Sequence, residues 1–154
     1  MKNKLRFPKS HRGQSLVELA ISLIILVFLL SGAVEFGIAF FQFVQLRDAA
    51  QEGALFGSMN PPDADGDQTE ENAIIARAQA SSSSPINLAT DPNVAFNVVV
   101  TDSKYCEGGS LQVTITYPHR IFMPVIPVLI GSNTIPLTAR VTDTILTPIC
   151  PPGP

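Results

Sequence analysis

The sequence contains few of the side chains on which most enzymes depend. It has two histidines, His11 and His119, and two cysteines, Cys106 and Cys150. The two histidines do not have the spacing of a metal-binding motif. No glycine-rich phosphate loop or nucleophile motif is present. Neither histidine has a general acid or base partner that the sequence makes evident, so we expect no catalysis and no resident cofactor.

Acidic residues are absent from the first 13 residues, and basic residues are scarce after them. The remainder of the chain carries a net charge of −8, because it holds five of the ten basic residues and all 13 acidic ones. A basic cluster next to an apolar run is typical of a membrane insertion signal rather than of a nucleic-acid-binding surface. The positive-inside rule places this end in the cytoplasm and the C-terminal domain outside. The five leader cations are Lys2, Lys4, Arg6, Lys9 and Arg12.

Charge is also absent from Leu19 to Val34, and proline is absent from Ser15 to Met59. We therefore predict a leader at 1–13 and one long helix at 14–59, whose N-terminal half spans the membrane. Such a helix is about 65 Å long, roughly twice the thickness of a bilayer core. Asn60-Pro61-Pro62 ends it.

Small residues mark two stretches of this helix. Ala33 and Gly37, four residues apart, are spaced for a close helix–helix contact. The second half is amphipathic, and its apolar stripe becomes smaller toward the C-terminal end, which would let a sheet approach closely. This stripe consists of Phe43, Leu46, Ala50, Gly53, Ala54 and Gly57.

Residues 60–93 combine an acidic loop, a short helix and a serine-rich linker. Asp63, Asp65 and Asp67 have the spacing of the first three ligands of a calcium loop, but the later EF-hand positions do not match. A solvated acidic turn and a calcium site both remain open. We expect a helix at 70–80, with Thr69 as its N-cap.

Three stretches within residues 94–150 alternate apolar and polar side chains, which predicts an antiparallel sheet of about three strands, and 151–154 form a proline-rich tail. The expected fold class is α+β, a long helix packed on a small sheet. We place the strands around 96–100, 111–117 and 135–142, with Tyr117 opposite Ile135.

The connection between the last two strands contains an apolar run, 121–130, broken by Pro124 and Pro127. It is too short to cross a membrane. One interpretation is a lid that folds back over the helix or sheet. The other is an exposed apolar patch for a partner subunit or for the bilayer surface.

Cys106 and Cys150 both fall in the part expected outside the cytoplasm. An even pair in that location indicates a disulfide, with two buried thiols as the alternative. Continuing the expected strand register brings the two cysteines close together at one end of the sheet.

Three separated blocks resemble a known family. The first is the basic leader ending in Gly13, with Glu18 five residues later at the start of the apolar run, which resembles a type IV prepilin signal. The second is Val34-Glu35-Phe36-Gly37 followed by residues 47–54, and the third is residues 113–142. Together they are similar to the TadE-like family of pilus-assembly proteins. The resemblance implies cleavage by a prepilin peptidase between Gly13 and Gln14. It also implies sister pilins or pseudopilins and an inner-membrane assembly platform as partners.

Glu18 and Glu35 are the two carboxylates that border the uncharged run. In a pilin-like assembly, Glu18 would pair with the new terminal amine of a neighbouring subunit and set the register. In an uncut anchor it would lie at the cytoplasmic interface near Arg12. Glu35 would either lie at the outer interface or form an intermolecular pair inside a helix bundle.

The resulting functional prediction is a minor pilin or pseudopilin of a Tad-type pilus or secretion system, acting by helix packing. Gln14 and Leu19 stand where filament-forming pilins often have aromatic residues, which favours a minor subunit. The alternatives are a major pilin, located in an extracellular filament, and a secreted or anchored binding domain such as an adhesin. A secreted domain would follow cleavage at a small-residue site, Ser31-Gly32-Ala33.

Overall fold

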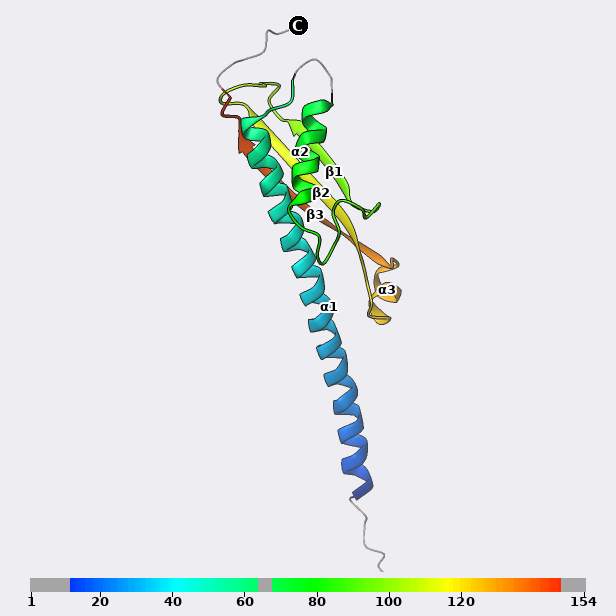
Figure 1. The fold of residues 1–154 in the computed structure, drawn as a ribbon. Helices are drawn as coiled ribbons and strands as arrows, with labels where there is room; N and C mark the ends of the chain where they lie inside the picture. The colour runs from blue at the N-terminus through cyan, green and yellow to red at the C-terminus, as the bar shows by residue number, and fades with distance from the viewer. Residues whose placement is uncertain (1–11, 64–67, 148–154) are drawn as a thin grey trace, which may run out of the picture.

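The computed structural model describes residues 12–63 and 68–147, and its dominant element is one long helix. Helix α1 runs from Arg12 to Met59, 48 residues, and ends where Pro61 and Pro62 prevent its continuation. Figure 1 shows the N-terminal half of α1 projecting alone, while the sheet and the second helix of the chain pack against its C-terminal half. The fold is α+β, as predicted.

A three-stranded antiparallel sheet in the order β1-β2-β3 packs against the C-terminal half of α1. The strands are β1 (Ala95–Val100), β2 (Ser110–Arg120) and β3 (Thr134–Thr144). Leu111, Val113 and Ile115 alternate with polar residues along β2 and are fully buried. This alternation turns one face of the sheet toward the helices and leaves the other face to solvent.

Helix α2 (Thr69–Ala80) covers the rest of the buried face and packs on α1. Ile74 and Ala78 on α2 are completely buried. The expected N-cap at Thr69 is wrong by one position, because Thr69 is the first helical residue and Gln68 occupies the cap without a side-chain capping bond.

The sheet approaches α1 most closely near the C-terminal end of the helix. A Cβ atom added to Gly57 would lie 2.2 Å from Leu111 Cδ2 and 2.9 Å from Ile74 Cδ1. A Cβ added to Gly53 would lie 3.2 Å from Ala78 Cβ. The two glycines thus lie where α1, α2 and β2 meet, and larger residues would hold these elements apart.

A buried amide side chain ties the serine-rich linker to α1. Gln45 is 6% exposed; its Nε2 donates to the Ile86 carbonyl at 2.6 Å, and its Oε1 accepts from the Ile86 backbone N–H at 3.0 Å. Both backbone groups of one buried residue are therefore satisfied by one side chain, which fixes the path of the linker along the helix.

The observed strand register differs from the expected one by two residues. Tyr117 pairs with Leu137, and Ile135 pairs with His119, because β2 continues to Arg120 instead of stopping at Tyr117. Pro118 is tolerated within β2 because β1 pairs only as far as Thr116, so the β1-facing edge of β2 needs no hydrogen bonds beyond that point.

Of the two interpretations of the apolar run, an exposed patch agrees better with its C-terminal part than a lid does. Helix α3 (Val125–Ile130) does not cover the sheet, and Val128 is 86% exposed. In Figure 1, α3 lies beside the middle of α1, at the opposite end of the sheet from the C-terminal end of α1.

The turn that contains Cys106 is bonded to the last described residues. Cys106 is 3% exposed, and the next two residues donate backbone bonds to the carbonyls of Thr147 (2.7 Å) and Ile145 (3.0 Å). Cys150 lies outside the described residues, so the disulfide stays a prediction. The geometry keeps residues 106–108 next to the segment that leads to Cys150.

Candidate functional site

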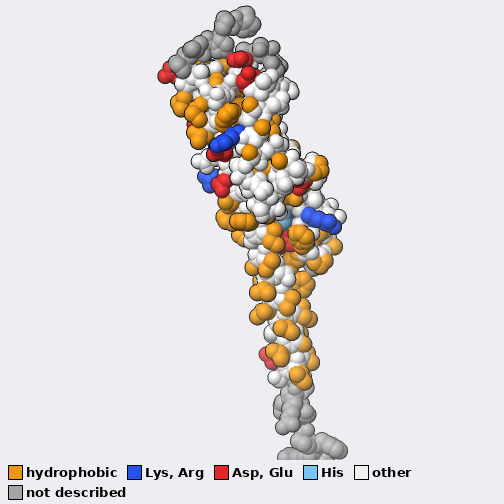
Figure 2. Space-filling model, in the orientation of Figure 1, with side chains coloured by type: hydrophobic (Ala, Val, Ile, Leu, Met, Phe, Trp, Pro, Cys, Tyr) orange, Lys and Arg blue, Asp and Glu red, His pale blue; other side chains and the backbone are white. Residues whose placement is uncertain are grey.

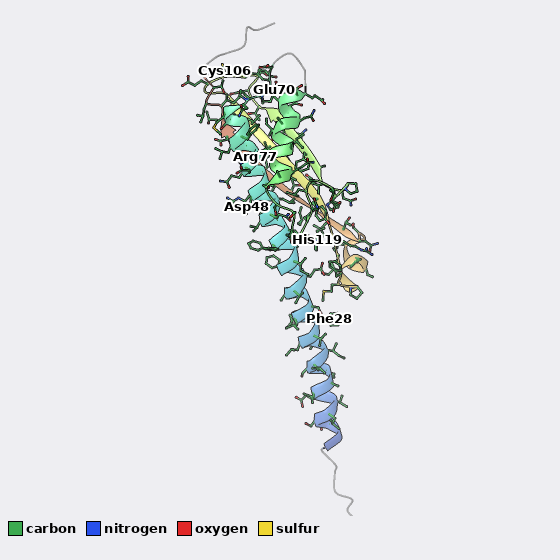
Figure 3. The ribbon with its side chains drawn as sticks, viewed as in Figure 1. Phe28, Asp48, Glu70, Arg77, Cys106 and His119 are labelled. Carbon is green, nitrogen blue, oxygen red and sulfur yellow. The ribbon has the colours of Figure 1, made fainter. Side chains whose placement is uncertain are left out.

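The N-terminal half of α1 exposes an apolar surface around its full circumference. Mean hydropathy reaches 2.6 over its most apolar 18-residue window, and none of that window is buried inside the protein. Figure 2 shows hydrophobic side chains covering this part of the helix, and Figure 3 shows Phe28 projecting from it. We call residues 16–34 the membrane segment, because they extend about 27 Å, close to the ~30 Å of a bilayer core.

Glu18 lies near the N-terminal end of this segment and is exposed, with no ion pair to any described residue. A carboxylate in an apolar environment is costly unless it is neutralised or paired. Gly13 and Gln14 are also exposed, one helical turn away. A partner for Glu18 must therefore come from the leader or from another molecule.

Ala33 and Gly37 are both exposed, and a Cβ added to Gly37 would meet nothing within 4 Å. In this they differ from Gly53 and Gly57, because side chains of α2 and β2 occupy the space beside those two glycines. The small-residue pair at 33 and 37 therefore remains free for contact with a second helix.

Glu35, at the other end of the membrane segment, has partners within the chain. His119 Nε2 lies 2.9 Å from Glu35 Oε1. The backbone N–H of Phe122 donates to both carboxylate oxygens, at 3.1 and 3.0 Å, and that of Met123 donates to Oε2 at 3.1 Å. A single carboxylate thus joins α1 to the end of β2 and to the loop that follows.

Gln42, two turns further along α1, completes this cluster. Its Oε1 lies 2.6 Å from His119 Nδ1, so His119 bridges two residues of the same helix face. His119 is 1% exposed overall, and Figure 3 shows it between β2 and α1. We call Glu35, Gln42, His119 and the backbone N–H groups of Phe122 and Met123 the polar clamp.

Tyr117 lies two residues before His119 on the same face of β2. Burial, with a smaller contribution from the carboxylate of Asp91, raises the pKa of its phenol above the ordinary value. The phenol of Tyr117 is therefore neutral at physiological pH, so it adds no charge beside His119.

The polar clamp was not predicted from the sequence. The expectation that His119 lies in a loop without an acid–base partner was wrong, because β2 extends through it and Glu35 is bonded to it. Two signals were available: His119 continues the period-2 pattern of buried residues on β2, and Glu35 and Gln42 are seven residues apart on one face of α1.

We expect loss of the Glu35 carboxylate to release residues 122 and 123. In a Glu35→Ala variant both N–H groups lose a charged acceptor, which is worth about 1.5–3 kcal/mol per bond. Hydrogen–deuterium exchange in detergent micelles should show these two amides exchanging about tenfold or more faster.

A matched control is Glu52→Ala, whose carboxylate pairs with Arg77 at the surface. Such an exposed pair contributes little, so this variant should leave exchange at residues 122 and 123 unchanged. Equal exchange in the parent and in Glu35→Ala would contradict the clamp.

The calcium prediction concerns residues that are only partly described. Asp63 is exposed, and Asp65 and Asp67 lie outside the described residues. Among the residues that are described, no three His, Cys, Asp or Glu side chains are grouped to hold a metal ion. The calcium hypothesis stays a prediction.

Comparison with known families bears on this same helix. Residues 13–55 match the model of the TadE-like protein family. The N-terminal helix is TadE-like. The match includes Glu18, the membrane segment, Glu35 and Gln42, and it confirms the resemblance of the second sequence block. It covers less than a third of the chain and does not test the basic leader or the prepilin-type cleavage signal of the first block. The third block, 113–142, lies outside it.

No curated protein and no solved structure matches the chain. The TadE-like match indicates involvement in Tad pilus assembly and interaction with other components of the pilus. Together with the exposed apolar surface of α1, it also indicates anchoring in a membrane.

Proposed function

We propose that the chain is a minor pilin or pseudopilin that acts in assembly of a Tad-type pilus or secretion system through helix packing, without catalysis. The observation that supports this most is the TadE-like match over a helix whose N-terminal half has no partner inside the protein. A helix that is apolar all round is stable only in lipid or in a bundle of similar helices.

The proposed mechanism uses each end of the membrane segment differently. A prepilin peptidase removes residues 1–13 and leaves an amine on Gln14. The Glu18 carboxylate of one subunit pairs with the Gln14 amine of its neighbour. Because these residues are four apart, the pair fixes an axial offset of about 6 Å between adjacent helices. Ala33 and Gly37 then allow the helices to approach closely.

The orientation follows from the leader charges. The basic residues before Gly13 keep the N-terminus in the cytoplasm, and the sheet and α2 lie outside the cell membrane. The partners in this scheme are other pilins or pseudopilins, a prepilin peptidase and an inner-membrane assembly platform.

Abundance distinguishes the minor subunit from a major pilin. Deleting the coding sequence from cells that express the protein natively should reduce surface pili, and restoring it should recover them. Purified pili should then contain this chain as a small fraction of the protein, measured by quantitative mass spectrometry. A filament made mainly of this chain would support the major-pilin alternative, and normal pili in the deletion strain would contradict both.

A further inference from the structure

The apolar loop, residues 121–130, presents large hydrophobic side chains to the outside of the protein. Phe122 is 68% exposed, Val128 86% and Ile130 49%. Nearby on β3, Ile135 is 41% exposed. Each such side chain moved from water into an apolar environment contributes about 1.5–3 kcal/mol, so an aqueous setting for this loop is unfavourable.

The polar clamp fixes the height of this loop along α1. Two consecutive backbone N–H groups, at Phe122 and Met123, are bonded to Glu35, the residue that follows the membrane segment. Glu35 lies about 29 Å along the helix axis from Leu16. If the membrane segment fills the bilayer core, the loop lies at the boundary between hydrocarbon and headgroups.

A cleft of about 310 Å³ separates the loop from α1 just beside the clamp. Leu30, Val34 and Ile38 line one wall, and Phe122, Met123 and Pro124 line the other. Only Ser31 and Glu35 add polar groups. Apart from these two residues the walls of the cleft are apolar, so the apolar surface of the membrane segment continues onto the loop.

Charge near the loop fits a headgroup region better than a dry subunit contact. Arg120 is exposed at the end of β2, immediately before the loop, and no acidic residue occurs from 108 to 142. Arginine beside interfacial apolar side chains can bond lipid phosphates. Figure 2 shows hydrophobic side chains along the lower part of the molecule, and a Lys or Arg side chain on its right-hand side just above them.

We propose that the apolar loop is a second membrane contact, lying flat in the bilayer interface on the side of the sheet, with Phe122, Val128 and Ile130 in lipid. The occupant is the bilayer itself, because the loop is continuous with the membrane segment and is pinned at its edge. Residues 122–130 and α1 then hold the sheet at a fixed tilt to the membrane before assembly. This contact does not depend on the pilus role.

Tryptophan fluorescence tests this directly, because the sequence contains no tryptophan. Single substitutions Phe122→Trp and Val128→Trp replace exposed side chains, so neither should disturb the core. The full chain is reconstituted into vesicles of phosphatidylethanolamine and phosphatidylglycerol, with and without brominated acyl chains. Phe28→Trp reports the bilayer core, and Leu146→Trp, 62% exposed at the far end of the sheet, reports water.

We expect both loop tryptophans to emit at shorter wavelength than Leu146→Trp and to be quenched by brominated lipid, as Phe28→Trp is. Quenching of the loop positions by aqueous acrylamide to the same extent as Leu146→Trp would overturn the proposal. A second result would also overturn it: shielding from acrylamide that increases with the protein-to-lipid ratio, with no quenching by brominated lipid. That result would show that the loop contacts a second copy of the chain.

Discussion

A Glu18→Ala variant is expected to produce at least about tenfold fewer surface pili than the parent, with unchanged amounts of the protein in the membrane. Breaking a charge pair in an apolar environment by removing one partner costs about 3–5 kcal/mol, and each 1.4 kcal/mol is a factor of ten in the equilibrium. Pili are counted by electron microscopy, and membrane content is measured by immunoblotting.

The matched control is Asp48→Ala, which removes an exposed carboxylate from the same helix outside the membrane segment. We expect normal piliation from it. If Glu18→Ala also assembled normally, Glu18 would be an interfacial residue of an anchor, and the proposed pairing with the Gln14 amine would be wrong.

A Gly57→Leu variant is expected to lose about 3 kcal/mol of folding free energy. The Cβ alone would lie 2.2 Å from Leu111 Cδ2, and both neighbouring side chains, Leu111 and Ile74, are fully buried. Overpacking typically costs about 1–3 kcal/mol and more for large insertions, while the better helix propensity of leucine returns only about 1 kcal/mol. For a folded domain of this size, the temperature at the midpoint of unfolding should fall by about 10 °C or more.

Thermal unfolding followed by circular dichroism in detergent provides the measurement, and Gly37→Leu provides the control. Gly37 has open space around it, so leucine there should leave the midpoint unchanged. It should instead reduce piliation if the surface at Ala33 and Gly37 packs against a neighbouring helix. Equal midpoints for Gly57→Leu and Gly37→Leu would contradict the observed packing of α1 on the sheet.

The sequence was most informative where one periodic pattern persists over many residues. The proline-free run from Ser15 to Met59 predicted α1, and the alternation around Leu111 to Ile115 predicted β2. In both cases the pattern reflects a single physical requirement, a lipid-facing surface or a sheet with one buried face, so local sequence is sufficient.

The clamp and the linker contact could not be found in this way, because each joins residues far apart in the chain. Glu35 and His119 are separated by 84 positions, and Gln45 and Ile86 by 41. The second strand was predicted to end at Tyr117, although the proline at position 118 is tolerated on the edge left unpaired beyond Thr116. That error moved His119 into a loop and shifted the register by two residues.

The N-terminal residue of the protein isolated from native cells tests the central claim most directly. Intact-mass and peptide mass spectrometry identify it without any variant. A chain that begins at Gln14 is the result predicted for a pilin-like subunit that enters an assembly. A chain that begins at Met1 would indicate a plain anchor, and one that begins at Val34 would indicate a secreted domain; either result would contradict the account.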